Sequence, residues 1–396
     1  MLSFSTLVTR LRCVVLGRAS TMGWLGASIA IASESLGQTS APSWKLTTTR
    51  IVPIAAPDGT PATSLNGVIL TARGDMVVAL ADVPTILLMR PDGKARSYAG
   101  RRGAGPGEFA RISGIATLGD SIVAADPNLN RFSVFALDTS SVRFFRAVPM
   151  RRTLAALLQG GNALCQPLPL AQPDLINAPW PLMLCGWDGE VRDTITIRRH
   201  PRSAITFTGP QRSINVLRVE GLDAFDDTPL WRLTPGGAAF VIIDRPAATS
   251  PRTAQYSVTV IDAAGDTVRG HPYRSRPRAI PASHVNSVVD ELSEVARRSF
   301  PSLEAARSVI RPAVKAPPYY PPVSQAFVST DGRIWLRTEA KRTAVQWRVL
   351  DTSGQTVALV SEPSGIRLEA ATATMVLGTQ DTDDGVRLVQ FKIETP

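Results

Sequence analysis

Histidine is scarce in this chain of 396 residues, which contains His200, His271 and His284. No two of these residues have the spacing of a metal-binding pair, so the sequence does not favour a zinc enzyme with histidine ligands. The chain also lacks the G-x-S-x-G motif and any paired carboxylate signature of a hydrolase. We therefore expect no catalytic residues, no bound metal and no cofactor.

Cysteine is equally scarce, since the chain contains Cys13, Cys165 and Cys185. Cys165 and Cys185 both lie in apolar, strand-like runs that can be neighbours in one sheet. In an exported protein such a pair forms a disulfide or remains as two buried thiols. The sequence leaves both alternatives open, because a bridge requires a Cα separation of ~5.5 Å.

No apolar run is long enough to span a bilayer, which takes ~20 residues. The apolar run near the N-terminus, residues 22–32, has 11 residues and is followed by small residues at 39–41. Three arginines precede it: Arg10, Arg12 and Arg18. We interpret residues 1–41 as a signal peptide and expect a periplasmic or extracellular protein. Translation from Met22 would remove these arginines and put the signal in doubt.

Lysine is rare as well, although the formal net charge is +10. Five residues are lysine, and no basic run exceeds two consecutive residues. Scattered arginines are typical of a solvated surface rather than of a polyanion site. The charge therefore does not favour a nucleic-acid partner.

Turn-forming residues are plentiful, with 29 glycines and 31 prolines spread along a chain that is 44% hydrophobic. This composition predicts a folded protein of many short strands. Residues 103–135 show the pattern in full. A glycine-rich entry, GAGPGEF, precedes an apolar strand, a turn at Gly119, a second strand that ends at Asp126, and a third strand that begins at Arg131.

The same pattern recurs along the chain. The turns between the first and second strands fall near Gly74, Gly119, Gly161, Gly237, Gly332 and Ala373, at intervals of 45, 42, 76, 95 and 41 residues. Three intervals match a four-stranded repeat of ~40 to 45 residues, and the other two indicate insertions of roughly 35 and 50 residues. We therefore predict six sheets in a single domain, residues 42–396.

Two segments depart from this repeat. The last unit has three strands, and the lone strand at Trp44–Ile54 can complete it and close a ring of sheets. The second insertion, at about 281–316, contains apolar residues at helical spacing from Ser283 to Ala296. Pro301 ends this helix, and a second short helix is expected at about 302–310. This small helical insertion is interpreted as a buttress or a lid on one rim.

The stretch GAGPGEF, followed by ISGIA and DSIVAADPNLNRFSVF, resembles the NHL-type repeat. The resemblance covers about residues 44–396, although only this second unit matches the motif specifically. It implies an all-β fold, a six-bladed β-propeller of the type that bacteria export. Some NHL-type propellers are lyases with zinc held by histidines and others bind RNA, but this chain lacks a matching histidine pattern and a concentrated basic face.

These observations predict an exported, non-catalytic binding module, a monomer that uses one mouth of the ring. The partner is an unknown small molecule, glycan or protein, and the alternative is a divergent propeller enzyme, a lyase or a hydrolase. Candidate binding residues lie in the polar turn and in the proline-rich segment: Asp126, Asn128, Asn130, Arg131, Tyr319 and Tyr320. For Asp126 and Arg131 the competing interpretation is a hydrogen bond or ion pair within the blade. The GAGPGEF segment is interpreted as a structural crossing with Phe109 packed beneath it.

Overall fold

The computed structural model describes residues 41–71, 73–138, 141–150, 154–165, 180–198, 204–208, 214–218, 225–341 and 344–396. Residues 41–396 form one compact unit. The predicted signal segment up to residue 40, Cys13 and His200 therefore lie outside the described residues. Within the described ranges, no helix is long and apolar enough to cross a membrane.

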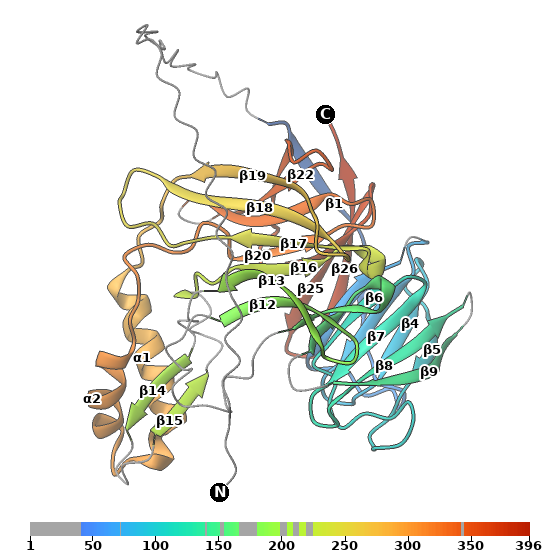
Figure 1. Ribbon diagram of the computed structural model, residues 1–396, viewed down its shortest axis with the longest axis horizontal. Coiled ribbons are helices and arrows are strands. Elements are labelled where there is room, and N and C mark those ends of the chain that lie inside the picture. Colours follow the sequence, from blue (N-terminus) through green and yellow to red (C-terminus); the bar gives the residue numbers. More distant parts are fainter. Residues whose placement is uncertain are drawn as a thin grey trace, which may run out of the picture. The chain divides into compact units, whose positions relative to one another are not determined.

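The described chain is dominated by β-strands in four-stranded antiparallel sheets, in which consecutive strands are neighbours (Figure 1). The first sheet contains β2 (Leu65–Leu70), β3 (Met76–Leu80), β4 (Ile86–Met89) and β5 (Ala95–Ala99). The second contains β6 (Gly114–Leu118), β7 (Ser121–Asp126), β8 (Arg131–Leu137) and β9 (Val142–Pro149). The third contains β10 (Leu154–Leu157), β11 (Asn162–Cys165), β12 (Trp180–Gly186) and β13 (Val191–Arg198). The fourth contains β16 (Leu230–Leu233), β17 (Ala239–Asp244), β18 (Ala254–Asp262) and β19 (Thr267–Ser275).

The remaining long strands form an eight-stranded sheet in the order β20-β21-β22-β23-β1-β26-β25-β24. One half contains β20 (Gln325–Val328), β21 (Ile334–Lys341), β22 (Ala344–Leu350) and β23 (Thr356–Ser361). The other half contains β1 (Ser43–Pro53), β24 (Arg367–Ala371), β25 (Met375–Thr382) and β26 (Gly385–Glu394). We call these halves the fifth and sixth units.

Strand β1 joins the two ends of the chain. It pairs antiparallel with β26 from Lys45 to Pro53, as predicted for the strand that completes the last unit. Its first two residues also pair in parallel with β23, opposite Leu359 and Val360. This second pairing, which the sequence pattern did not predict, merges the fifth and sixth units into one sheet.

Buried apolar side chains fill the space between neighbouring sheets. Clusters join each unit to the next along the chain. A further cluster joins the sixth unit to the first, where Met76 packs with Leu377 and Leu388. Sheets that bury both faces against neighbours in a closed succession form a propeller-like arrangement. No unit can bury these surfaces alone, so we expect the described unit to unfold cooperatively.

The glycine-rich connection between β5 and β6 packs as predicted, with the Phe109 side chain fully buried beneath it. Gly100 has a φ of 85°, and a Cβ at this position would lie 2.4 Å from the Phe109 ring. Glu108 accepts hydrogen bonds from the Gly105 N–H (2.8 Å) and from Arg101 Nε (2.8 Å). The glycines therefore allow a close crossing of the backbone over an aromatic ring.

Two insertions interrupt the repeat of sheets. The predicted helices are confirmed as α1 (Ala282–Ala296) and α2 (Leu303–Ala313), whose buried residues pack with Phe225. Short 3₁₀ turns lie at η1 (Gln159–Gly161), η5 (Pro235–Gly237) and η6 (Arg297–Ser299). The hairpin of β14 (Ala204–Thr208) and β15 (Ile214–Arg218), which contacts α2, was not predicted. Its two five-residue strands lie outside the repeat period that identified the other strands.

Candidate functional site

A cavity of about 480 Å³ lies where the first strands of the units converge. Residues of β2, β6, β10, β16, β20 and β24 line it, so every unit contributes its first strand. The cavity therefore occupies the axis around which the sheets are arranged. Its size falls in the range of ~300–1,000 Å³ that is usual for small-molecule sites.

One end of this cavity is crossed by hydrogen bonds between the turns that follow the first strands. The Gly119 N–H donates to the Gly236 carbonyl (2.7 Å), and the Gly236 N–H donates to Thr117 Oγ1 (2.7 Å). Gln159 Nε2 donates to the same Gly236 carbonyl (2.8 Å). Gly236 has a φ of 79°, a conformation that favours glycine. Turns of the second, third and fourth units thus close part of this end.

The connections between units lie at the opposite end of the cavity. Because strands alternate in direction within each antiparallel sheet, the fourth strand returns to the end where the next first strand begins. The connection that contains β14 and β15 precedes β16, and the connection that contains α1 and α2 precedes β20. Both insertions therefore enter the sheets at the same end, which we call the mouth.

Among the described residues that line the cavity, Arg232 and Glu369 are the charged ones. Arg232 Nε donates to the Ala326 carbonyl of β20 (2.7 Å), and Nη1 donates to the Trp231 carbonyl (2.8 Å). Burial lowers the pKa of the Arg232 guanidinium, and the negative charge of Glu369 partly offsets this effect. The cavity thus contains a desolvated cation that is oriented by backbone carbonyls.

Two neighbouring side chains hold Glu369 in place by hydrogen bonds. Its Oε1 accepts hydrogen bonds from Arg367 Nε (2.6 Å) and from Thr379 Oγ1 (3.1 Å). The register between β24 and β25 shifts between Leu368 and Ala370, so Glu369 is the extra residue of a bulge. Bulges redirect a side chain relative to the regular alternation of a strand. This bulge explains how a carboxylate comes to line the cavity from a strand of the core.

The predicted binding residue Asp126 lies in the turn between β7 and β8 and is fully buried. Its Oδ2 accepts hydrogen bonds from the N–H groups of Ala110 (2.8 Å) and Arg111 (3.3 Å). Its Oδ1 accepts from the N–H groups of Asn128 (3.1 Å) and Leu129 (3.1 Å). The carboxylate therefore connects its own turn to the segment that enters β6.

Arg131, at the start of β8, holds the same connection through its guanidinium. Nη1 donates to the Ala104 carbonyl (3.1 Å), and Nη2 donates to the Gly105 and Glu108 carbonyls (2.6 and 2.7 Å). Asn128 and Asn130 are exposed, and Asn130 has a φ of 50°. The four turn residues gather at the mouth end but do not line the cavity. Their role in binding stays a prediction.

Tyr319 and Tyr320 precede β20 and lie beside the helical insertion. The Tyr320 hydroxyl hydrogen-bonds with His284 Nδ1 of α1, and the Arg278 guanidinium carbon lies 3.6 Å from the centre of the Tyr320 ring. Tyr319 forms an isolated β-bridge with Ala279. Both tyrosines are partly exposed, so a role at the rim stays a prediction.

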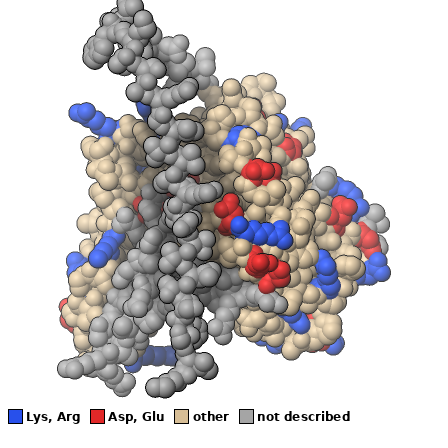
Figure 2. Space-filling view, viewed as in Figure 1, with Lys and Arg blue, Asp and Glu red and all other residues tan. Residues whose placement is uncertain are grey.

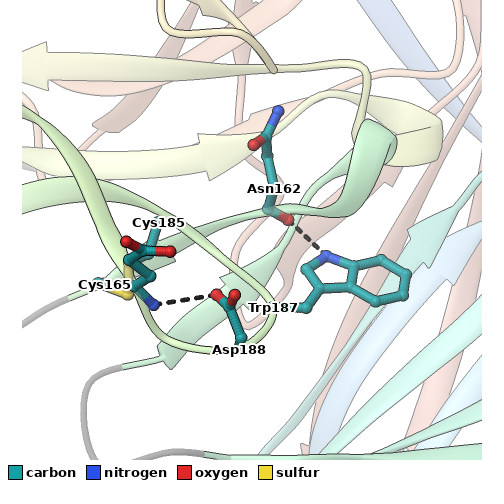
Figure 3. Close-up of a disulfide and its surroundings, with 6 residues drawn as sticks. Asn162, Cys165, Cys185, Trp187 and Asp188 are labelled. Carbon is teal, nitrogen blue, oxygen red and sulfur yellow. Dashed lines mark hydrogen bonds between the residues drawn. A yellow bond between two sulfur atoms is a disulfide. The ribbon is translucent and has the colours of Figure 1, made fainter.

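Cys165 and Cys185 form a disulfide between β11 and β12 (Figure 3). Cys165 lies opposite Met183 and Cys185 lies opposite Ala163, which gives a Cα separation of 6.2 Å. This separation lies within the range of ~4.4–6.8 Å that a bridge needs. Beside the bridge, the Trp187 indole N–H donates to the Asn162 carbonyl (2.6 Å), as Figure 3 also shows.

Replacing both cysteines by alanine is expected to lower the free energy of unfolding by about 3 kcal/mol, because the cross-link limits the unfolded chain. The bridge spans a sequence separation of 20 residues. Urea unfolding of the oxidised protein, the reduced protein and the Cys165→Ala/Cys185→Ala variant would measure the loss. Equal unfolding midpoints for the oxidised protein and the double variant would contradict the prediction.

Neither Arg232 nor Glu369 was predicted from the sequence. The available signal was the presence of charged residues inside mainly apolar first strands, as in PLWRL and IRLEAAT. On the face shown in Figure 2, basic and acidic residues are intermixed on the right-hand part of the described surface. Within the described ranges, no group of three or more His, Cys, Asp or Glu residues is placed to hold a metal ion.

Comparisons with known proteins show only remote likenesses. No protein-family model and no curated protein matches the chain. A "putative exported protein" from Bacteroides fragilis has a TM-score of 0.47 and 11% identity, with 89% of this chain and 95% of that chain covered. The PQQ-bound aldose sugar dehydrogenase from Streptomyces coelicolor has a TM-score of 0.41 and 11% identity, with 89% and 100% covered. The calcium-binding protein regucalcin from Agrobacterium tumefaciens has a TM-score of 0.38 and 11% identity, with 90% and 97% covered. At these values the likenesses carry no conclusion about this chain.

Proposed function

We propose that this chain is an exported, non-catalytic binding protein, a six-bladed β-propeller that holds a small ligand in its axial cavity. The observation that carries the proposal is the cavity of about 480 Å³, which is lined by the first strand of every unit and crossed by turns at one end. A ligand enters from the mouth, where the connections and insertions lie.

The blade count rests on the strand pairing. Four sheets have four strands each, and the eight-stranded sheet divides at the parallel pairing of β1 with β23 into two further groups of four. The cluster that contains Met76, Leu377 and Leu388 then closes the ring between the last blade and the first. The NHL-type resemblance of the second unit supports the same count.

The lining of the cavity supports binding of a small molecule. Its walls are mostly apolar, and a few polar groups face it, among them Thr117, Gln325 and Arg232. Such a combination of apolar walls with few polar anchors is usual for ligand pockets. Among the predicted binding residues, the exposed or partly exposed Asn128, Asn130, Tyr319 and Tyr320 are proposed to contribute to entry rather than to the cavity itself. Asp126 and Arg131 are proposed to support the mouth by holding the connection that enters β6.

A cavity-filling substitution tests this function. Ala116 lines the cavity, so Ala116→Trp is expected to abolish binding of fragments that ligand-detected NMR finds on the wild-type chain of residues 42–396. The matched control is Ala147→Trp, on the exposed side of the outer strand β9, which is expected to leave binding unchanged. Melting temperatures of both variants would show that each is folded. Fragments that bind the folded Ala116→Trp variant as well as the wild type would disprove an axial site.

A further inference from the structure

Within the described residues, no carboxylate lies within salt-bridge distance of Arg232, although its guanidinium lines an apolar cavity. We infer that the axial cavity takes a small organic carboxylate, whose carboxylate group pairs with Arg232 and whose apolar body lies against the cavity walls. This inference rests on the proposed function and specifies its ligand class.

The hydrogen bonds of Arg232 orient it for this role. Guanidinium carries five N–H donors in a rigid plane, and the carbonyls of Ala326 and Trp231 accept from Nε and Nη1. These two contacts fix the plane of the group, while donors of Nη2 are left for a ligand. A planar guanidinium with a fixed orientation matches the geometry of a carboxylate.

Glu369 does not neutralise Arg232 by direct contact. Its Oε1 is engaged by Arg367 Nε at 2.6 Å, so the two charges of that pair balance each other. Among the described residues of the lining, Arg232 and Glu369 are the two opposite charges, and Arg367 pairs with Glu369 from outside the lining. The Arg232 guanidinium has no carboxylate in salt-bridge contact among these residues, so an anion that enters the cavity gains a charge-assisted hydrogen bond with it in a region of low dielectric constant.

The other residues of the lining restrict the chemistry of the part of the ligand that does not contact Arg232. Ile69, Leu157 and Val328, from three different first strands, belong to the apolar walls. A single cation between such walls, with Glu369 also in the lining, matches one carboxylate on a hydrocarbon body better than a multiply charged anion.

Paired probes test the inference on the wild-type chain. Isothermal titration with hexanoate and with its neutral isostere hexanamide is expected to give at least tenfold tighter binding of hexanoate, because a charge-assisted hydrogen bond is lost in the amide. Arg232→Met keeps an unbranched apolar stem and removes the guanidinium and its charge, and it is expected to remove this difference. The control is Arg143→Met, on an exposed side chain that pairs with Asp138, which is expected to preserve it.

Further variants keep the test informative if Arg232→Met is unfolded. Arg232→Lys is expected to retain part of the preference for hexanoate, and Glu369→Gln is expected to strengthen hexanoate binding severalfold by removing a nearby negative charge. Equal affinities of hexanoate and hexanamide for the wild type, both abolished by Ala116→Trp, would overturn the carboxylate inference but keep the cavity as a binding site. Binding of both probes to Ala116→Trp would instead overturn the axial site, and no binding of hexanoate to the wild type would overturn the inference.

Discussion

A chain shortened to begin at Ala55 is expected to lose its cooperative fold, because it lacks β1. The strand pairs with β26 along most of its length and with β23 at its start, so its removal exposes the edges of both neighbouring strands. Trp44 and Val52 of this strand and Ile54 directly after it are buried, and all three are absent from the shortened chain. Their burial contributes about 1.5–3 kcal/mol each, which together approaches the stability of an entire domain.

Circular dichroism and size-exclusion chromatography would measure this effect. The control is a chain that begins at Ala41, which keeps β1 and is expected to unfold cooperatively as a monomer. Exposed strand edges favour association, so the shortened chain is expected in aggregates. A synthetic peptide of residues 41–54 added in excess should restore part of the fold. A monomeric shortened chain with an unchanged melting temperature would show that β1 does not close the ring.

The second large effect is expected for Asp126→Ala, which should lower the free energy of unfolding by about 3 kcal/mol or more. The carboxylate accepts hydrogen bonds from four backbone N–H groups, and alanine leaves these donors without their acceptor. An unsatisfied buried donor costs about 1–3 kcal/mol, and these four hydrogen bonds are partly buried, so each is expected to contribute a part of that cost. Asp126→Asn keeps one acceptor oxygen and is expected to have an intermediate effect.

Denaturant unfolding would measure the free energy of unfolding of both variants. The matched control is Asp120→Ala in the exposed turn between β6 and β7, which is expected to change stability by less than ~0.5 kcal/mol. A ligand screen on the same variants separates two roles of Asp126. Unchanged stability of Asp126→Ala together with lost ligand binding would contradict a mainly structural role and support the predicted binding role.

Local residue patterns were sufficient to predict most strands and their order. Apolar runs bounded by turn residues, such as MVVALA before TILLMR, correspond to β3 and β4, which are shorter than these runs by one and two residues. The helices α1 and α2 followed from helical spacing and from Pro301. The pairing of β1 with β26 was also predictable, because an incomplete last unit and a lone first strand complement each other.

The candidate site was not predictable in the same way. The polar turn from Asp126 to Arg131 stood out as a candidate surface, but its two charged residues hold the connection that enters β6. Arg232 and Glu369, which line the cavity, looked like ordinary residues of core strands. Side chains of a strand face the cavity or a neighbouring sheet according to twist, bulges and packing, and a one-dimensional pattern does not encode these.

The sequence by itself determined the all-β class, the repeat of strands and turns, the place of the helical insertion and the closing role of β1, because each depends on local alternation, turn chemistry or the count of strands. Only the tertiary structure decided that the first strands converge on one cavity and that Gly119 and Gly236 meet across its end. It also decided that Arg232 lies inside this cavity without a carboxylate in salt-bridge contact among the described residues. The physical reason is that these contacts join residues from different units, whose distances depend on how all the sheets pack together.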